Sequence, residues 1–447
     1  MNLFDKHSAQ LTVIILNQHV ENVFYLEPKM RERPYWLRKL MVISILALFG
    51  SLLLGSVFYD DSTGEWPQFL GPSRNGISSE TGLAKSWATT GPKVLWRTPL
   101  GDGYSRVVIS KGRGYTLFSK GDDEFVICVD AKSGKEIWRV RSDSTFKDTN
   151  GNGPRSTPAI HGEAVYALGA RGKLHALNVK NGKSLWRHDL KKEFNSVGPS
   201  DGGYASSPLI EGEMLLIEAG GAGGNAFVAF NKKSGQLIWK AESDSAGFSS
   251  PVAYTINGQR QIIFFSGDGA VAVTPENGKT LWRLPWKTSY NVNAALPLFV
   301  PPDKVFISSG YDVGATLLRL KNENGSMAFE EIWKNKSMQN IFPTSILQGN
   351  YLYGFDRGTL KCMDVNTAEE KWKQRGFGVG SLIYADGHLI VLSDKGKLVL
   401  IEATPEGYKE KASAEILEGR CISVPALANG RLYLRNTKEL VCVDLVN

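Results

Sequence analysis

Short apolar runs, separated by glycine, asparagine and proline, dominate the chain after residue 60. Residues 164–168 (Ala-Val-Tyr-Ala-Leu) and 173–177 (Lys-Leu-His-Ala-Leu) are examples, because each runs apolar for a few positions and then meets a turn. No stretch beyond residue 60 keeps apolar residues at helical spacing over three turns. The pattern therefore predicts an all-β protein built from many short strands.

Tryptophan recurs within this strand pattern, and several copies share the same surroundings. A glycine precedes the tryptophan by four positions in residues 130–138, 178–186, 231–239 and 274–282, which predicts a tight turn and a returning strand. The full series is Trp96, Trp138, Trp186, Trp239, Trp282, Trp333 and Trp372. Its spacing of 39 to 53 residues is typical of a four-stranded propeller blade, a unit that buries its faces by stacking on its neighbours. We expect these tryptophans to dock neighbouring blades against each other.

The number of blades follows from the segments that have the pattern of an innermost strand. Eight such segments begin at Tyr104, Ser156, Ser207, Ser250, Ala295, Pro343, Gly380 and Val424. The seventh blade lacks the outer tryptophan, and residues 414–417 are predicted to form its outer strand. The eighth has no chain left for an outer strand after residues 439–444, whereas Val94–Arg97 forms an outer strand without a blade. Pairing the two removes the open edges, so we predict an eight-bladed β-propeller closed by its N-terminal strand, with seven blades as the alternative.

Residues 130–138 and their copies resemble the tryptophan-docking motif of pyrroloquinoline-quinone-like (PQQ-like) propeller repeats. That family includes quinoprotein alcohol dehydrogenases and the propeller lipoprotein of the outer-membrane β-barrel assembly machinery. Residues 66–76 and 153–158 resemble secreted members common in planctomycete-type bacteria. The resemblance covers roughly residues 65–447 and implies the propeller fold. Because such repeats occur in enzymes and in scaffolds, it leaves the activity open.

The N-terminal part of the chain predicts where the propeller is located. Residues 40–59 are uncharged and mostly apolar, long enough to span a bilayer, with basic residues before them and two aspartates after them. We predict a disordered cytoplasmic extension (1–36), a transmembrane anchor or signal helix (37–59), a linker and extension packing on the propeller (60–93) and the propeller itself (94–447). The predicted location is the inner membrane, single-pass, with the propeller in the periplasm. The alternative is a secreted or periplasmic protein after signal cleavage.

The net charge bears on nucleic-acid binding, and the positions of the cysteines bear on core packing. The formal net charge of +7 comes from lysines scattered in turns, without a basic helix or an aromatic–basic strand motif, so we predict no nucleic-acid binding. Cys128, Cys362 and Cys442 fall at one repeat position, where other blades place alanine, which indicates a small buried site. Cys421 stands apart, at the start of an inner strand.

The sequence lacks features that cofactor binding would require. The resemblance to quinoprotein dehydrogenases implies an adjacent cysteine pair and a bound calcium, but no two cysteines are neighbours here. Asp148, Asn150 and Asn152 match the opening of a calcium loop, yet its twelfth position is Ala159 instead of a bidentate glutamate. We therefore predict no cofactor and no metal, with PQQ and calcium as alternatives and these three residues as the metal candidates.

A binding face is predicted where the loops between blades open around the axis. The aromatic, amide and charged residues expected to converge there are Arg155, Asp201, Tyr204, Phe248, Asn291, Asn293 and Arg420, with Tyr290 and Phe342 at comparable positions. The favoured function is a non-catalytic binding or scaffold module of the cell envelope, with an envelope protein or peptide as partner and the inner membrane as anchor. A PQQ-dependent oxidoreductase and a carbohydrate- or small-ligand-binding propeller are the alternatives.

Overall fold

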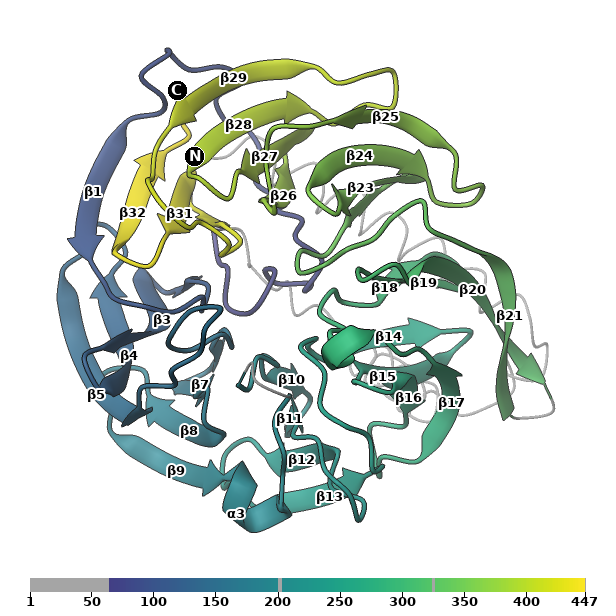
Figure 1. Cartoon of the computed structure of the whole chain (residues 1–447). Coiled ribbons are helices and arrows are strands. Elements are labelled where there is room, and N and C mark those ends of the chain that lie inside the picture. The colour runs from purple at the N-terminus through teal and green to yellow at the C-terminus, as the bar shows by residue number, and fades with distance from the viewer. Residues whose placement is uncertain (1–63, 200–202, 324–325, 447) are drawn as a thin grey trace, which may run out of the picture. The chain divides into compact units, whose positions relative to one another are not determined.

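The computed structural model describes residues 64–199, 203–323 and 326–446. They form eight four-stranded antiparallel sheets arranged around a central axis (Figure 1), which confirms the predicted eight-bladed β-propeller and excludes seven blades. Helical structure within these ranges is confined to α3 (Leu190–Phe194) and the 3-10 turn η2 (Ser289–Asn291), so no helix in them could cross a bilayer. The predicted segments 1–36 and 37–59 lie outside the described residues.

The first four blades follow each other along the chain, each running from its inner to its outer strand. Blade 1 comprises β2 (Val108–Ser110), β3 (Arg113–Lys120), β4 (Asp123–Asp130) and β5 (Glu136–Ser144). Blade 2 comprises β6 (Ala159–His161), β7 (Ala164–Leu168), β8 (Lys173–Asn178) and β9 (Ser184–Asp189). Blade 3 comprises β10 (Leu209–Glu211), β11 (Met214–Glu218), β12 (Phe227–Asn231) and β13 (Leu237–Ala241). Blade 4 comprises β14 (Val252–Ile256), β15 (Gln259–Phe265), β16 (Gly269–Val273) and β17 (Thr280–Pro285).

The remaining blades continue in the same sense until the chain returns to its first strand. Blade 5 comprises β18 (Leu298–Val300), β19 (Lys304–Ser309), β20 (Gly314–Glu323) and β21 (Ser326–Asn335). Blade 6 comprises β22 (Ile346–Gln348), β23 (Tyr351–Asp356), β24 (Thr359–Asp364) and β25 (Glu370–Gln374). Blade 7 comprises β26 (Ser381–Ala385), β27 (His388–Leu392), β28 (Lys397–Glu402) and β29 (Glu410–Glu415). Blade 8 comprises β30 (Ala426–Ala428), β31 (Arg431–Arg435), β32 (Glu439–Asp444) and, as its outer strand, β1 (Val94–Pro99).

Blade 8 closes the ring with strands from both ends of the propeller. β1 pairs antiparallel with β32, and Trp96 lies opposite Cys442. Arg97 adds an ion pair to Glu439 at 3.0 Å and donates to the carbonyl oxygen of Ile416 at 2.8 Å. The predicted closure by the N-terminal strand is therefore confirmed. It leaves β32 paired on both sides instead of exposing an unpaired edge.

A buried arginine joins blade 8 to blade 1. The guanidinium of Arg435 donates to the carbonyl oxygens of Gly101, Gly103 and Leu117 at 3.1, 3.0 and 2.8 Å. Gly101 and Gly103 belong to the connection that leaves β1, and Leu117 lies on β3. Burial lowers the pKa of Arg435 to about 9, so the side chain stays charged at neutral pH and its donors are matched by carbonyl dipoles.

The outer strand of every blade shows the same local irregularity. The pairing register shifts beside the residue that faces the outer tryptophan, as at Cys128 opposite Trp138 and at Ala176 opposite Trp186. Such a bulge bends the strand and increases its twist. The cross-strand neighbour of the tryptophan is alanine or cysteine in six blades, whereas in blade 5 it is Leu317. Cys128, Cys362 and Cys442 are buried, as predicted for small core residues, and the separate Cys421 is buried as well.

The outer tryptophans lie at the junctions between blades. Six of them donate their indole N–H to a backbone carbonyl oxygen of the next blade at 2.7–3.2 Å, namely Trp96, Trp138, Trp186, Trp239, Trp333 and Trp372. Trp282 differs, because its indole donates to Gln261 of its own blade at 2.7 Å while its ring meets the edge of Phe329 in blade 5. Aromatic burial of this kind supplies much of the packing energy between blades.

The glycine of each repeat contacts the tryptophan of the preceding blade, not the one that follows it in sequence. A Cβ atom on Gly235 would lie 2.8 Å from Cδ2 of Trp186, and the residue adopts φ +75°. Both the contact and the left-handed backbone require glycine there. Gly134, Gly182 and Gly278 stand in the same relation to Trp96, Trp138 and Trp239.

Blade 7 corrects one sequence prediction. Its outer strand is β29, which ends at Glu415, so residues 414–417 supply only its last two positions. The position that faces Leu400 and holds tryptophan elsewhere is Ala412. Ile416 and Leu417 are buried beyond the end of the strand, which explains why their apolar pattern was mistaken for the strand itself.

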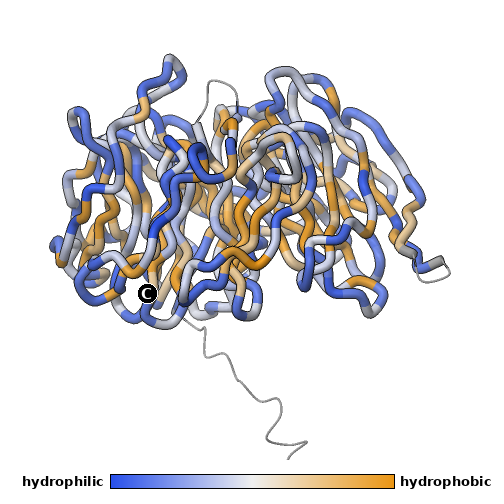
Figure 2. Tube along the Cα trace, turned by 90° about the horizontal axis from the view of Figure 1, so that it is seen from below, coloured by the Kyte–Doolittle hydropathy of each residue, from blue (hydrophilic) through white to orange (hydrophobic). Residues whose placement is uncertain are grey.

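The hydrophobic residues follow the strands, and the hydrophilic ones gather in the turns at the two ends of the propeller (Figure 2). One of these ends, which we call the base, is crossed by residues 64–91, the basal segment. Backbone hydrogen bonds tie this segment to Ile109 of blade 1, Ile160 of blade 2 and Tyr384 of blade 7, and Figure 1 shows it in purple across the centre of the ring. Its Trp66 and Phe69 are buried. The basal segment therefore belongs to the core of the propeller.

Candidate functional site

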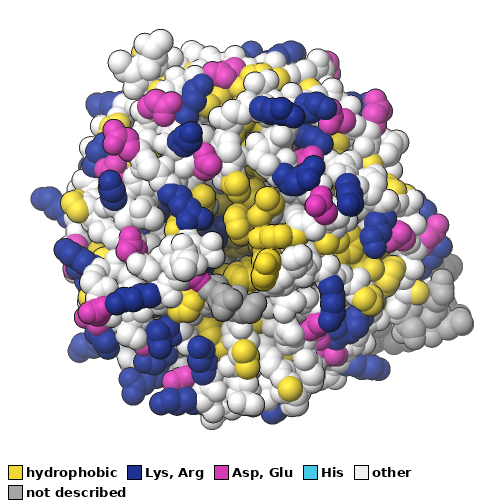
Figure 3. All heavy atoms as spheres, in the orientation of Figure 1, with side chains coloured by type: hydrophobic (Ala, Val, Ile, Leu, Met, Phe, Trp, Pro, Cys, Tyr) yellow, Lys and Arg dark blue, Asp and Glu magenta, His cyan; other side chains and the backbone are white. Residues whose placement is uncertain are grey.

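The loops that connect the outer strand of one blade to the inner strand of the next open at the end opposite the base. We call this end the loop face, and Figure 3 looks onto it. Hydrophobic side chains lie in a hollow at its centre, and lysine and arginine side chains stand around the hollow (Figure 3). The predicted binding and metal residues that the structure describes come from loops of this end, so each of them can be placed against the hollow.

The loop with the predicted metal candidates closes on itself. The backbone N–H of Asn150 donates to the carboxylate of Asp148 at 2.6 Å, and the side-chain oxygen of Asn152 accepts from the backbone N–H of Asp148 at 3.2 Å. Arg155 lies 3.9 Å from the same carboxylate. These oxygens serve the loop's own turn, and no cluster of three metal-ligating side chains occurs in the described part of the chain. The arrangement does not fit a calcium-bound quinone, and we derive no chemistry through one.

Arg155 supports this loop from beneath. Its guanidinium lies over the rings of Phe146 and Tyr104, at 4.9 and 5.7 Å from their centroids, and donates to the carbonyl oxygen of Gly151 at 2.7 Å. Only 13% of its side chain is exposed, and burial lowers its pKa. Arg155 therefore stabilises the loop and presents little surface to a ligand, contrary to its predicted role in a binding face.

Two further residues of the predicted face are buried. Tyr204 is 1% exposed, its hydroxyl lies 2.6 Å from the hydroxyl of Ser196, and burial raises its pKa to about 12. Asn293 is fully buried, and its amide donates to the carbonyl oxygens of Ser266 and Trp286 at 2.8 and 3.0 Å. The polar groups of both side chains form internal hydrogen bonds that hold loops of the loop face in place. Both are therefore buried, in contrast to the exposed positions expected from the sequence.

The other predicted residues lie in different parts of the ring. Asp201 lies outside the described residues. Phe248 and Asn291 are partly exposed on the loops after β13 and β17, whereas Arg420 is exposed on the loop after β29. The structure therefore does not bring the predicted set together, and of its members only Arg420 lines the central cavity of this face.

A cavity of about 560 Å³, which we call the central hollow, lies at the junction of blades 6, 7 and 8. Its lining residues are Phe342, Val379, Asp394, Lys395, Gly419, Arg420 and Ile422. Phe342 is 39% exposed although its ring is apolar. Uncovered apolar groups beside cations in a concavity are suited to bind another molecule.

Sequence reasoning missed five of these lining residues: Val379, Asp394, Lys395, Gly419 and Ile422. Val379 and Ile422 each precede an inner strand, in the same type of loop as Phe342, so their position was the available signal. Lys395 lies in the turn between β27 and β28. That type of turn also reaches the loop face, but no sequence pattern indicates that this lysine approaches the axis.

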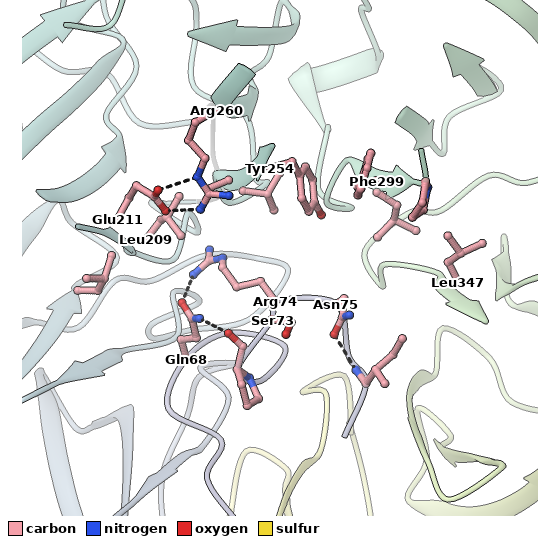
Figure 4. A pocket seen from close by; sticks show the side chains of 17 residues that line it. Gln68, Ser73, Arg74, Asn75, Leu209, Glu211, Tyr254, Arg260, Phe299 and Leu347 are labelled. Carbon is pink, nitrogen blue, oxygen red and sulfur yellow. Dashed lines mark hydrogen bonds and ion pairs between the residues drawn. The ribbon is translucent and has the colours of Figure 1, made fainter. Parts of the chain in front are cut away.

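A second cavity, also of about 560 Å³, lies at the base between the basal segment and the inner strands of blades 3 to 6 (Figure 4). The basal segment contributes Gln68, Ser73, Arg74 and Asn75 to its wall. The inner strands contribute apolar and aromatic groups, including Leu209, Tyr254, Phe299 and Leu347. This basal cavity was not predicted, because it depends on how the basal segment folds back across the ring.

The charged groups of the basal cavity have partners within the protein, although Nε of Arg74 has no hydrogen-bond partner among the described residues. Arg260 forms a two-pronged ion pair with Glu211, at 2.7 and 2.6 Å (Figure 4). The buried Arg74 donates to the carbonyl oxygen of Pro208 at 2.9 Å and to the side chain of Gln68 at 3.2 Å. Burial lowers the pKa of Arg74 to about 9, so it remains charged at neutral pH. Hydrogen bonds to fixed oxygens offset the cost of burying this charge.

Two buried carboxyl groups lie between blades under the loop face. Glu218 of β11 accepts from the backbone N–H of Gly247 at 2.6 Å, and burial raises its pKa to about 8. Glu124 of β4 accepts from the hydroxyl of Ser142 at 3.0 Å, and burial raises its pKa to about 7. Neither residue lines the central hollow. The backbone N–H of Ala170 in blade 2 donates to Glu124 at 3.2 Å, so both carboxyl groups link neighbouring blades.

The family model that matches this chain covers residues 122–374 and is described as outer membrane protein assembly factor BamB. The BamB of Shewanella oneidensis is 22% identical over 266 residues, which span 56% of this chain and 64% of that protein, less than two thirds of its length. The BamB of Burkholderia pseudomallei is 24% identical over 303 residues, which span 64% of this chain and 72% of that protein. The quinohemoprotein alcohol dehydrogenase ADH IIB of Pseudomonas putida is 26% identical over 235 residues, spanning 50% and 28%.

Solved structures with the same fold come from both kinds of relative. BamB from Moraxella catarrhalis superposes with a TM-score of 0.58 at 14% identity, covering 79% of this chain and 98% of that one. The quinohemoprotein alcohol dehydrogenase ADHIIG from Pseudomonas putida HK5 gives a TM-score of 0.57 at 12% identity, covering 86% and 80%. At such identities the similarity establishes the propeller architecture.

Proposed function

Because the chain belongs to the family of the outer membrane protein assembly factor BamB, we propose that it is a non-catalytic scaffold of the cell envelope. Its loop face binds a protein or peptide of the envelope. The propeller supplies a rigid platform, and the partner contributes the other half of the interface. This function needs no chemistry from the platform, only a shaped surface.

The observation that carries the proposal is the uncovered central hollow. Phe342 exposes 39% of its surface at the centre of an otherwise well-packed ring, next to Val379 and Ile422. Apolar groups clustered in a concavity are the usual centre of a protein interface, with polar groups around them. The match to assembly factors over residues 122–374 supports the same reading, since those relatives are named for assembling other proteins.

The proposed location is the periplasmic side of the inner membrane, with residues 37–59 as the anchor. Support comes from the sequence, where a long uncharged apolar run follows basic residues. Protease added to spheroplasts is expected to degrade the propeller. Protection of the propeller in intact spheroplasts would contradict this location, and a freely soluble mature protein would show that the segment is a cleaved signal.

A quinone-dependent oxidoreductase is supported less well. Relatives named as quinohemoprotein alcohol dehydrogenases match half of this chain, so the alternative deserves a direct test. Asp148 is held by Arg155 and by its own turn, which leaves the predicted metal loop poorly arranged for a cation. Mixing the protein with PQQ, calcium, alcohols and an electron-accepting dye should give no substrate-dependent reduction of the dye.

The proposed function is tested by photo-crosslinking in cells. A photoreactive phenylalanine analogue replaces Phe342 in the central hollow, and the same analogue replaces Leu185 on the outer strand of blade 2 as the matched control. Leu185 is 50% exposed, so both sites are accessible to a neighbouring protein. We expect a defined envelope protein to be crosslinked from position 342 and not from position 185.

Two outcomes of this experiment decide against the proposal. One is the absence of any crosslinked protein at position 342 although the propeller is folded and exported. The other is the same set of products from both positions, which indicates random collision. Val379→Asp, which places a charge in the hollow, should abolish the product from position 342 if the contact is specific.

A further inference from the structure

The apolar part of the central hollow comes from three successive blade junctions. Phe342 lies on the loop between β21 and β22, Val379 on the loop between β25 and β26, and Ile422 on the loop between β29 and β30. Each loop is anchored by the blades on either side of it, so the spacing of the three side chains is set by the ring. A partner can therefore meet three fixed apolar contacts without ordering the surface first.

Two basic residues of the hollow and one of a neighbouring recess have no acidic partner. Lys395 and Arg420 line the hollow, and Arg375 lines a recess of about 470 Å³ on blade 6. The recess and the hollow are neighbours, because Gly358 of one loop packs against the backbone of Gly378 of the other. Among the described residues, no carboxylate oxygen lies within 4.0 Å of the charged nitrogens of these three cations.

Two other cations of this sector already have acidic partners. Arg357 pairs with Asp312 at 3.2 Å, and Lys361 with Asp356 at 2.6 Å. Asp394, the acidic residue of the hollow, accepts a hydrogen bond from the backbone N–H of Val379 at 3.3 Å. Asp394 has no ion pair among the described residues, so the lining of the hollow carries two cations, Lys395 and Arg420, against one carboxylate.

Arg420 is held in position without losing its charge. Its guanidinium lies over the ring of Tyr104, 5.2 Å from the centroid, and donates to the backbone carbonyl oxygen of Asn150. Neither contact brings a negative charge to the arginine. A cation fixed in this way retains its attraction for a carboxylate and loses less conformational entropy when it binds one.

From this arrangement we infer that the central hollow binds an acidic segment of the partner's chain, with apolar side chains seated on Phe342, Val379 and Ile422. The inference rests on the proposed function of the loop face and specifies the partner's chemistry. Carboxylates of the segment meet Arg375, Lys395 and Arg420, which gives charge complementarity around an apolar centre. A nucleic acid backbone brings phosphates but no apolar anchors, and a flat anionic membrane does not enter a concavity.

The test measures direct binding to the full-length protein in detergent. The probe is a fluorescein-labelled synthetic peptide of alternating aspartate and leucine, followed by fluorescence anisotropy. Two comparison peptides carry asparagine for aspartate or serine for leucine, and vesicles of phosphatidylglycerol and a labelled single-stranded DNA test the other occupants. We expect the aspartate–leucine peptide to bind at least about tenfold more tightly than either comparison peptide, with affinity falling as salt rises.

Charge reversal locates the binding site. The variant Arg375→Glu, Lys395→Glu, Arg420→Glu should bind the peptide about tenfold more weakly, the sum expected from three exposed ion pairs. The matched control reverses three exposed lysines without ion pairs in turns at the base, Lys132→Glu, Lys183→Glu and Lys279→Glu, and should bind like the wild type. Arg375→Glu with Lys395→Glu alone leaves the contacts of Arg420 intact and should show most of the effect, so a folding defect of the triple variant does not obscure the result.

The outcomes separate this inference from the proposed function. Equal affinity for the aspartate and asparagine peptides, equal binding by the two triple variants, or binding of vesicles or DNA alone would overturn the acidic-segment inference. In that case a specific crosslink from position 342 would still leave the scaffold function standing. Peptide binding that depends on the three cations supports the inference even when the cellular crosslink is absent.

Discussion

The two ends of the propeller's central axis differ in whether the protein's own chain covers them. At the base, the chain covers the inner strands with its own basal segment, which buries Trp66 and Phe69 and forms backbone hydrogen bonds to three blades. At the loop face, Phe342, Val379 and Ile422 line a hollow that no part of the described chain covers. The charges differ in the same sense, since Arg260 of the base pairs with Glu211 whereas Lys395 of the loop face has no ion pair among the described residues.

This difference indicates that the base contributes to folding stability and the loop face to binding. A surface that the protein covers with its own chain contributes to folding and offers little to a partner. A surface left apolar and charged stays available for binding and adds little to folding. The contrast therefore predicts that equivalent changes at the two ends will have different consequences.

The largest effect should come from removing the cover of the base altogether. A protein that begins at residue 100 lacks the basal segment and β1, so it exposes β32 and the inner strands of blades 1, 2 and 7. We expect it to aggregate or fail to fold, because unpaired strand edges and uncovered apolar side chains promote association. Size-exclusion chromatography and thermal melting measure this, with a protein beginning at residue 64 as the control. A monomer with an unchanged melting temperature would refute the importance of the cover.

A matched pair of aromatic truncations sharpens the contrast. Trp66→Ala at the base should lower the free energy of unfolding by about 3–5 kcal/mol, because the ring is 2% exposed and leaves a cavity. Phe342→Ala at the loop face should lower it by only about 1 kcal/mol, since that residue is 39% exposed and its truncation leaves no enclosed cavity. Chemical denaturation measures both values, with Trp66→Phe as a milder control. Similar costs at the two positions would erase the distinction between the ends.

The smallest effect concerns pH. Burial raises the pKa of Glu218 to about 8 from an ordinary value of 4.5, so the unfolded chain releases this proton at lower pH than the folded protein does. The stabilisation is complete below pH 4.5 and is lost as the pH rises through about 8. Glu218→Gln should flatten this decline in unfolding free energy, whereas Arg74 at the base, with a pKa of about 9, stays protonated over most of the range. Parallel stability curves for wild type and Glu218→Gln would contradict the assignment.

The fold was predictable because the sequence repeats, and the prediction failed where a blade departs from the repeat. Seven tryptophans at blade spacing specify the ring, because each one needs a neighbouring blade to bury it. In blade 7 the equivalent residue is Ala412, and without the large side chain the outer strand was placed too late in the sequence. Contacts that occur once, such as the donation of Trp282 to Gln261, carry no periodic signal.

The candidate site was less predictable than the fold. A residue type in a loop does not indicate whether the side chain turns outward, and Tyr204 and Asn293 both turn inward to hydrogen-bond other loops. Arg420 was placed correctly on the central face, but its neighbours Val379 and Ile422 are ordinary aliphatic residues. Their role depends on the convergence of three blade junctions, which is a property of the closed ring and not of any local pattern.

The closure of blade 8 also has a consequence in time. Arg97 of β1 and Glu439 of β32 pair across 342 positions of sequence, so the strand made first must remain without its partner until nearly the whole propeller has been synthesised. Contacts of such long range form late, because the intervening chain must be ordered before they stabilise anything. An interrupted chain can build blades 1 to 7 but cannot close the circle. A stable propeller therefore requires synthesis of the whole chain, and incomplete chains remain accessible to proteases.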